Sequence, residues 1–504
     1  MSEIELKFGI VPASVPEIER AMTRGGARSI RIESRYWDTR QRHLARANLS
    51  LRLRKSGGRW EQTVKAAGSS PAERLEETVR CRGVAAGEPP KPDASLHSAT
   101  RAGRLLDDAL GADAAALELV HTTRVRRRLL VVELNDSRIE VALDRGEIEA
   151  GGRSLPICEV EAELKQGDAI DLVEFGRRSI DAHAMWLSTT TKSARGNLLA
   201  QGSGDVPPAV KSERPTFHVN ATAEEIFRAA VVSCLDQVLA NASIVASGAF
   251  DDEVVHQLRI GLRRMRTVWR EMPQWRGDLT TSWLRPAADV FRALGVERDR
   301  RTVAAALRQP LREAGSPDPD LHAPAGAQRV DVVELVRAKD FQHALLDLLE
   351  FAVDRPIESA QDVDCRAPPH PSEESPRVVI AGRLGKLHRR MQRDAKRFAD
   401  LSEVDRHAAR KRLKRLRYLT ELVAPLFGKR PLARFLRALE PAQDELGRYV
   451  DLLVAGRLSR DLAEAGDGRA WFNVGWLQAR EAHAIRRCSA TLRQVADASP
   501  FWRR

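Results

Sequence analysis

A two-residue alternation of charged and apolar side chains marks the first part of the chain. In residues 3–7, Glu3, Glu5 and Lys7 alternate with apolar residues. Because side chains of a β-strand point alternately to its two faces, this segment has one ionisable face and one apolar face. The same pattern recurs in residues 51–54, 62–65, 122–126, 139–144 and 159–163. These segments predict strands of a single sheet.

The repeated ionisable face is either a solvated exterior or the lining of a closed barrel. The Leu, Val and Ile residues of the opposite face suit packing beneath covering helices, which favours the lining. A small barrel encloses one ligand. Basic groups bind phosphate oxygens and carboxylates bind divalent cations, so a lumen with both suits a strongly anionic ligand held together with metal ions.

The hydrophobic period becomes helical from about Thr216. We predict a strand-rich domain at 1–201, with helices near 14–24 and 99–109, a flexible linker at 202–215 and a helical domain at 216–504. A stretch at 355–376, rich in Pro, Asp, Glu and Ser, divides the helical domain into halves of about 216–354 and 377–504. The predicted fold class is α+β: a closed antiparallel β-barrel with covering helices, followed by an all-α domain of two similar helical bundles.

The two helical halves repeat a basic pattern. His256 and His407 are each followed by basic residues at offsets of three, seven, eight and ten. At about 100° per residue, offsets of zero, three, seven and ten fall within an arc of roughly 80°, so one face of each helix is basic. The basic residues are His256, Arg259, Arg263, Arg264 and Arg266 in the first half, and His407, Arg410, Lys414, Arg415 and Arg417 in the second.

These basic faces lack neighbouring acids. No carboxylate lies between His256 and Arg270, or between His407 and Thr420. A solvated face usually carries acids at i,i+4 positions that relieve the repulsion between like charges. A polyanion-binding face therefore fits this pattern better than a solvated face, which is the alternative.

Composition supports a polyanionic partner. The 504 residues include 82 Lys and Arg against 70 Asp and Glu, a formal net charge of +12, with 43% hydrophobic residues. The five cysteines are scattered, which predicts reduced thiols and neither a disulfide framework nor a zinc site. Acids at Glu3 and Glu5 argue against a signal peptide, and no uninterrupted apolar run of 18 residues occurs, so we expect a cytoplasmic protein.

The N-terminal motifs resemble the CYTH domain of the triphosphate tunnel metalloenzyme superfamily. The hallmark is Glu3-x-Glu5-x-Lys7. It is followed, in the order of that family, by Tyr36-Trp37-Asp38-Thr39, Leu51-Arg52-Leu53-Arg54, Thr63-x-Lys65, Glu140-x-Ala142-x-Asp144-x-Gly146, Glu159-x-Glu161-x-Glu163 and Lys192-x-x-Arg195-Gly196.

From about Phe217 the chain resembles the CHAD domain, a helical module with conserved histidines that is built of two similar halves and associated with inorganic polyphosphate. The match is the duplicated pattern that begins at His256 and His407. This order of domains resembles that of bacterial inorganic triphosphatases. The resemblance implies that the basic face of the helices binds polyphosphate.

The CYTH resemblance implies metal-dependent hydrolysis of inorganic triphosphate (tripolyphosphate) to diphosphate and orthophosphate. It implies one or two Mg²⁺ or Mn²⁺ ions, held by Glu3, Glu5, Asp144, Glu159, Glu161 and Glu163. It implies that the triphosphate is held by Lys7, Arg52, Arg54, Lys65, Arg124, Arg126 and Lys192. The candidates for activating water are Lys65, Glu140 and Glu161. The sequence leaves open which of these acts, and which arginines of residues 124–128 enter the tunnel.

Other functions remain as alternatives. Adenylate cyclases and thiamine triphosphatases of this superfamily use the same tunnel, and a non-catalytic polyphosphate-binding protein would have the same motifs. No adenine-reading group of residues stands out. The basic helices lack the interleaved aromatic residues with which proteins stack on single-stranded nucleic acid. We therefore expect inorganic triphosphate and polyphosphate as partners, and neither nucleic acid nor a membrane.

Overall fold

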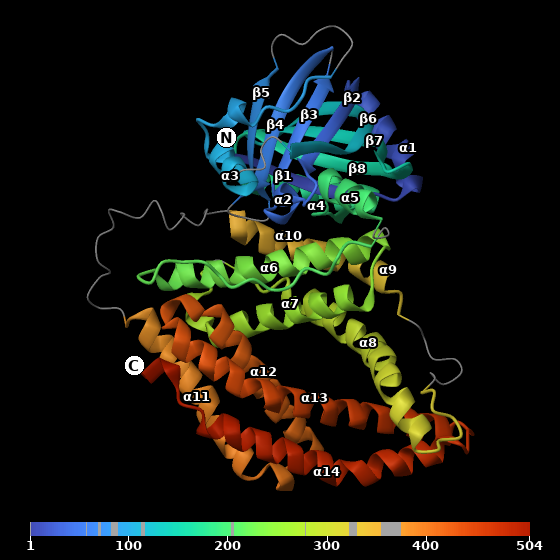
Figure 1. Ribbon diagram of the computed structural model, residues 1–504, viewed down its shortest axis with the longest axis vertical. Helices are drawn as coiled ribbons and strands as arrows, with labels where there is room; N and C mark the ends of the chain where they lie inside the picture. Colours follow the sequence, from blue (N-terminus) through green and yellow to red (C-terminus); the bar gives the residue numbers. More distant parts are fainter. Residues whose placement is uncertain are drawn as a thin grey trace.

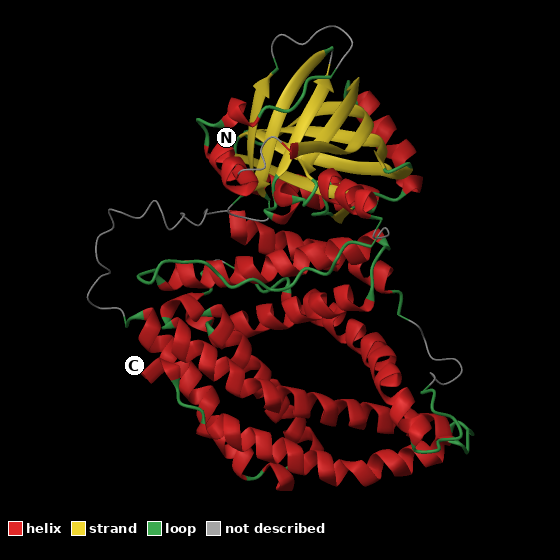
Figure 2. Ribbon diagram, viewed as in Figure 1, coloured by secondary structure: helices red, strands yellow, loops and turns green. Residues whose placement is uncertain are grey.

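The computed structural model describes residues 2–56, 58–68, 72–81, 89–111, 116–202, 206–277, 279–321, 330–353 and 374–503. A β-barrel forms one end of the molecule, and a larger helical domain forms the rest (Figures 1 and 2). The predicted fold class is confirmed.

Eight antiparallel strands close the barrel. Their order is β1-β5-β4-β3-β2-β6-β7-β8, and β1 pairs with both β5 and β8, which completes the ring. The strands are β1 (Ser2–Gly9), β2 (Arg28–Thr39), β3 (Ser50–Ser56), β4 (Arg59–Ala67), β5 (Glu73–Arg80), β6 (Leu117–Leu134), β7 (Ser137–Ala150) and β8 (Arg153–Gln166). A two-residue strand, β9 (Trp186–Leu187), pairs with β1. All six predicted segments lie in strands, whereas β2 and β5 were not predicted as strands.

Helices cover the apolar outer face of the barrel. They are α1 (Val15–Arg24), α2 (His43–Arg46), α3 (Arg101–Leu110) and α4 (Ala169–His183), whereas α5 (Lys192–Gln201) packs against the inward-facing Ile32 and Val125 and lines the cavity. The helices predicted near 14–24 and 99–109 are confirmed by α1 and α3. Leu51 of β3 and Val64 of β4 share a buried cluster with Leu106 of α3. Because these apolar residues point outward, the charged residues that alternate with them point into the barrel.

The helical domain consists of two successive sets of helices. The first set is α6 (Ala223–Ser247), α7 (Asp252–Glu271), α8 (Leu284–Glu313), α9 (Val332–Arg337) and α10 (Lys339–Val353); the second is α11 (Pro376–Lys396), α12 (Glu403–Leu422), α13 (Lys429–Glu464) and α14 (Ala470–Asp497). The repeated basic motifs lie on α7 and α12, which pack against each other, as α8 does against α13. The stretch predicted to divide the halves lies mostly outside the described residues.

Short 3₁₀ turns connect several of these elements, at Pro12–Ser14, Ala94–His97, Pro273–Trp275, Phe398–Asp400, Ala424–Leu426 and Phe501–Arg503. Among the described residues the cysteines Cys81, Cys158, Cys234 and Cys488 are unpaired, and Cys365 lies outside the described part.

Helix α6 is the central helix of the first set. Among the described residues it is the one helix long and apolar enough to cross a membrane, but most of its apolar stretch is buried inside the protein. Thr222 and Glu225 form a capping box at its first turn. A helix that is apolar all round and covered by protein is typical of a domain core.

The barrel and the helical domain share one hydrophobic core. Leu6 and Phe8 of β1 belong to the same buried cluster as Leu346 of α10 and the apolar residues of α6. In Figure 1, α10 and α6 lie directly beneath the barrel. Arg177 of α4 forms ion pairs with Asp347 and with Glu350 of α10, the latter at 2.6 Å. The helical domain therefore fixes the underside of the barrel.

The predicted flexible linker is in part held in place. Asn241 of α6 bonds the backbone of Val210 twice, accepting from its N–H at 3.1 Å and donating to its carbonyl oxygen at 2.8 Å. The Ser233 hydroxyl donates to the carbonyl oxygen of Glu213 at 2.7 Å. Flexibility was predicted from composition alone, whereas these backbone groups find partners on α6.

Candidate active site in the barrel

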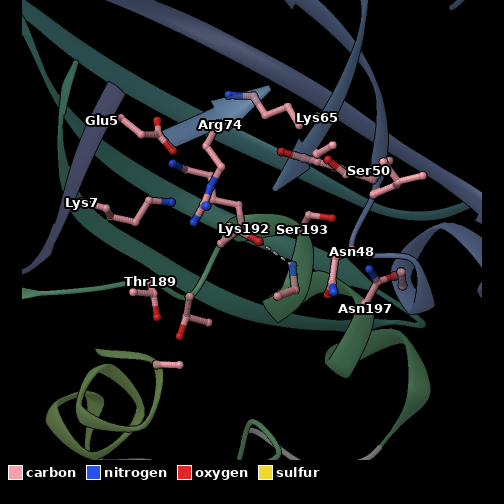
Figure 3. A pocket seen from close by; sticks show the side chains of 18 of the residues that line it. Glu5, Lys7, Asn48, Ser50, Lys65, Arg74, Thr189, Lys192, Ser193 and Asn197 are labelled. Atoms are coloured by element: carbon pink, nitrogen blue, oxygen red, sulfur yellow. Dashed lines mark hydrogen bonds between the residues drawn. The ribbon is translucent and has the colours of Figure 1, made fainter. Parts of the chain in front are cut away.

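The charged inner face of the barrel lines one cavity of about 1090 Å³. Figure 3 shows Glu5 and Lys7 of β1, Lys65 of β4 and Lys192 of α5 converging on it. The predicted site residues that line it are Glu3, Glu5, Lys7, Arg52, Arg54, Lys65, Glu140, Asp144, Glu161, Glu163 and Lys192. Residues far apart in sequence thus meet because consecutive strands of a barrel surround the same lumen.

Three carboxylates gather where Asp144 and Glu161 line the cavity, with the buried Glu159 next to them. Oxygen atoms of Asp144, Glu159 and Glu161 lie within 4.8 Å of one another. The Lys192 Nζ lies 2.7 Å from Asp144 Oδ2 and 2.8 Å from Glu161 Oε1, and it also contacts Glu159. The Lys7 Nζ lies 3.3 Å from Glu159 and 3.2 Å from Glu161. Acids and bases are therefore in direct contact along the lining.

These contacts keep the acids ionised. Burial by itself raises the pKa of Glu161, but Lys192, Lys7 and Arg127 together hold that pKa well below its usual value. Burial also opposes ionisation of Asp144, and Lys192 and Arg127 lower its pKa. Asp144 and Glu161 are thus held as charged oxygen donors.

The three carboxylates fit a divalent cation. Hard cations such as Mg²⁺ and Mn²⁺ prefer carboxylate oxygens, and the donor set contains neither the thiolates nor the imidazoles that favour softer metals. The other predicted metal ligands, Glu3, Glu5 and Glu163, line other parts of the cavity.

A second charged group involves β5, which the sequence analysis did not assign to the site. The Lys65 Nζ contacts Glu76 and lies 3.8 Å from Glu3, while Arg52 Nη2 lies 3.5 Å from Glu76. Burial and the neighbouring Glu76 raise the pKa of Glu3 to about 7. Burial opposes the ionisation of Glu76, but Lys65 and Arg52 lower its pKa to about 2.

The sequence does contain a signal for β5. Arg74, Glu76, Thr78 and Arg80 alternate with other residues over Glu73–Arg80, and the first two line the cavity. The period is the same as in the predicted strands, but Glu77 interrupts the apolar face. This interruption explains why the segment was missed.

Arg54 is a cation without a carboxylate partner. It lines the cavity, and among the described residues no acid lies within ion-pair distance of it. Burial, together with the nearby Arg52 and Arg127, lowers the pKa of Arg54 to about 10. Its Nε is buried without a hydrogen-bond partner. An anion in the cavity would satisfy this group.

The placement of Arg124 and Arg126 in the tunnel is wrong. Arg124 is exposed and pairs with Glu149, and the exposed Arg126 donates to Ser29 at 3.3 Å. The tunnel arginine of this strand is Arg127, which donates to Asp144 at 2.7 and 2.6 Å. Arg127 is paired with Asp144 across β6 and β7, and directly paired residues point to the same face of a sheet.

In the helical domain, one predicted ligand residue is structural. Arg264 is buried and donates to the carbonyl oxygens of Ser233 and Glu213 at 3.3 and 3.0 Å, and to the Gln237 side chain at 2.9 Å. Its offset of eight places it beside the basic arc and against α6, so its assignment to a polyphosphate-binding face is wrong. By contrast, the guanidinium groups of Arg259, Arg263 and Arg266 lie 5.4, 5.2 and 5.5 Å from the Phe291 ring of α8.

The second basic helix shows the same division. Arg415 lies 3.3 Å from Glu271, and Arg417 bonds Glu421 and Gln443, both at 2.7 Å, so acidic or amide partners already contact these two. His407, Arg410 and Lys414 are half-buried on α12, as His256 is on α7. Burial and the neighbouring Lys411 and Arg410 lower the pKa of His407. Its surroundings are therefore basic, as predicted.

The closed antiparallel barrel, lined with acids and bases, has the architecture of a tunnel. Residues 1–196 match the CYTH domain family and residues 229–460 match the CHAD domain family. The chain therefore carries a CYTH domain in its barrel part, followed by a CHAD domain.

Similarity to individual proteins is modest. The inorganic triphosphatase of Haemophilus influenzae is 28% identical over 208 residues, which cover 40% of this chain and 55% of that relative. The CHAD domain from the plant Ricinus communis is 23% identical, covers 57% of this chain and 96% of its own, and gives a TM-score of 0.45. An adenylyl cyclase from Hippeastrum, described as having a dominant triphosphatase activity, is 17% identical over 41% of this chain and 98% of its own, with a TM-score of 0.30.

Proposed function

We propose that the barrel hydrolyses inorganic triphosphate to diphosphate and orthophosphate with the help of Mg²⁺ or Mn²⁺. The observation that carries this proposal is Arg54, which lies beside Arg52 and Arg127 and, among the described residues, forms no ion pair of its own, in a cavity also lined by Asp144 and Glu161. Arg52 and Arg127 already pair with Glu76 and with Asp144, so the charge of Arg54 is left for a bound anion. A chain of phosphates brings several negative charges into this cavity.

In this proposal the basic residues position the substrate. Arg52, Arg54, Lys65, Lys7, Lys192 and Arg127 bind the phosphate oxygens and hold the terminal phosphorus open to in-line attack. Asp144, Glu159 and Glu161 hold the metal ion. Once bound, this ion supplies positive charge that stabilises the developing charge on the phosphoryl oxygens.

The water that attacks the phosphorus is oriented by a carboxylate that neither holds the metal ion nor forms a close ion pair. The depressed pKa of Glu161 makes it a weak proton acceptor, which suits a metal ligand better than a base. Lys65 is in contact with Glu76, so its ammonium group already has a carboxylate partner and is a poor proton acceptor. Glu140 lines the cavity and has one ion pair among the described residues, with Lys165 at 3.9 Å. We therefore infer that Glu140 orients the attacking water.

The helical domain is proposed to bind inorganic polyphosphate. The support is the arginine cluster around Phe291 and the basic surroundings of His407. Binding of long polyphosphate and of DNA, measured at matched salt, tests this proposal. A clear preference for DNA would contradict it.

The proposed hydrolase activity is tested by measuring phosphate release from tripolyphosphate, with ATP and thiamine triphosphate as alternative substrates in parallel assays. We expect tripolyphosphate to be the best substrate with Mg²⁺ or Mn²⁺, and Glu161→Gln to reduce turnover at least about 100-fold. The matched control is Glu149→Gln, because Glu149 pairs with Arg124 outside the cavity. Higher turnover of ATP or thiamine triphosphate would refute the proposed substrate.

A further inference from the structure

The helical domain supplies one wall of the barrel cavity. Ser233, Asp236, Gln237 and Ala240 of α6 line the same cavity as the charged strands, together with the segment 207–213 that precedes α6. Figure 1 shows α6 running beneath the barrel. The space available to a ligand on this side is therefore set by the helical domain and not by the barrel alone.

The lining changes its charge toward α6. Between the basic interior and this wall lie neutral polar side chains, which Figure 3 shows pointing into the cavity: Asn48, Ser50, Thr189, Ser193 and Asn197. On the α6 side itself stand two carboxylates, Asp236 and Glu213, and one cation, Lys211 of the segment before α6. This side therefore has more acids than bases, whereas several cations line the interior.

Asp236 is exposed to the cavity. Partial desolvation there, with the neighbouring Glu213 and against the opposing charge of Arg74, raises its pKa to about 6. Asp236 is therefore mainly ionised at neutral pH, and Arg74 is the nearby tunnel residue of opposite charge.

The wall is also held rigidly. The backbone N–H of Thr189 donates to the Ser243 hydroxyl of α6 at 3.0 Å, which ties α6 to the segment before α5. Buried Arg264 donates to both the Glu213 carbonyl oxygen and the Ser233 hydroxyl at 3.0 Å, joining the preceding segment to α6. The helix that carries Asp236 therefore keeps its place beside the cavity.

We propose that Asp236 is a specificity-determining residue that restricts the phosphate chain in the cavity to a short length. This inference rests on the proposed triphosphatase function. A chain of three phosphates is bound by the cations of the interior. Each further phosphate that extends toward α6 adds negative charge beside the Asp236 carboxylate, and like charges repel one another.

The test compares substrates of different chain length on the full-length protein. Initial rates are measured for tripolyphosphate, tetrapolyphosphate and long-chain polyphosphate, with the wild type, Asp236→Asn and Glu224→Gln. Glu224 lies on the same helix, is exposed and pairs with Arg228, so it controls for the loss of one negative charge from α6. We expect Asp236→Asn to raise the ratio of kcat/KM for tetrapolyphosphate over tripolyphosphate about fivefold or more, and Glu224→Gln to keep the wild-type ratio.

Two further variants guard against a folding defect. Asp236→Glu keeps the charge and is expected to keep the ratio within about twofold, whereas Ala240→Asp adds a carboxylate one turn along α6 and is expected to lower it. Thermal melting verifies that each variant is folded. An unchanged ratio in Asp236→Asn, or an equal rise in Glu224→Gln, would overturn the inference while triphosphate hydrolysis by the wild type upholds the proposed function. Absence of that hydrolysis would refute the function itself.

Discussion

The environment of Arg54 indicates that the cavity binds an anion. Arg54 is enclosed with two other arginines nearby, and the acid closest in effect, Glu76, already pairs with Arg52 and Lys65. Keeping such a group charged costs free energy that a bound anion recovers. Positive charge held in advance is what a phosphate-binding site requires, because the basic groups need no rearrangement when the substrate arrives.

Replacing Arg54 tests this interpretation directly. We expect Arg54→Ala to lower kcat/KM for tripolyphosphate by about 10- to 100-fold, since a hydrogen bond to a charged group contributes about 1.5–3 kcal/mol. Arg124→Ala is the matched control, because Arg124 is exposed and pairs with Glu149 outside the cavity. Equal losses in both variants, measured as phosphate release, would contradict the assigned direction of the two side chains.

Asp236 gives a pH-dependent prediction. Its pKa is raised to about 6 in the folded protein, above the usual value near 3.8. The folded state therefore binds this proton more tightly than the unfolded state, and the resulting stabilisation is complete below about pH 4 and lost as the pH rises through 6. Asp236→Asn is expected to melt at a higher temperature than wild type at pH 8. At pH 4 the two should melt alike, and a difference of the same size at both pH values would exclude this cause.

At the scale of the element, helix α7 has one side that packs against α6 and another side that is basic and more exposed. Arg264 points toward α6 and bonds its backbone and side chains, whereas Arg266 is exposed beside Phe291 and α8. Both arginines belong to the repeated basic motif, and they lie two residues apart. Because two residues turn a helix by about 200°, the same residue type has a different environment on each side.

This division predicts different effects on stability. Arg264→Leu is expected to lower the free energy of unfolding by about 2–4 kcal/mol, because it leaves buried carbonyl and amide oxygens without a donor. Arg266→Leu should change it by less than about 0.5 kcal/mol. Denaturant unfolding measures both. In polyphosphate binding the order should reverse, so that Arg266→Leu weakens binding in a folded protein.

At the scale of the molecule, the barrel and the helical domain behave as one folded body. Leu6, Phe8 and Leu346 belong to a single buried cluster that continues through both sets of helices. Gln342 of α10 accepts a hydrogen bond from the backbone N–H of Leu187 in β9 at 2.8 Å. A continuous core couples the unfolding of its parts, so we expect the full chain to unfold without a separate transition of the barrel.

The ion pairs between α4 and α10 can be tested with two variants of neighbouring arginines. Arg177→Ala removes the pairs with Asp347 and Glu350 and should lower the free energy of unfolding by about 1–2 kcal/mol. The neighbouring Arg178 pairs with Glu174 on the exposed side of the same helix, so Arg178→Ala should cost less than about 0.5 kcal/mol. Equal effects in thermal or denaturant unfolding would show that the contact contributes little.

Much of this architecture follows from local periods in the sequence. The alternation at Glu3-x-Glu5-x-Lys7 and its repeats predicted strands with a charged inner face, and the spacing after His256 and His407 predicted two basic helices. Both patterns depend on the geometry of a single strand or helix, which neighbouring residues determine. Missing β5 and placing Arg124 in the tunnel were failures of the same method, where Glu77 interrupts the pattern or where arginines occupy both faces of a strand.

The sequence by itself therefore determined the class of fold, the order of the domains and the chemical character of the cavity. Only the tertiary structure decided that Arg127 faces Asp144, that Arg54 has no acidic partner, that Arg264 is buried, and that Asp236 of α6 enters the barrel cavity. The reason is physical: these facts depend on strand register and on packing between residues that are distant along the chain, and no local period encodes which distant residues come into contact.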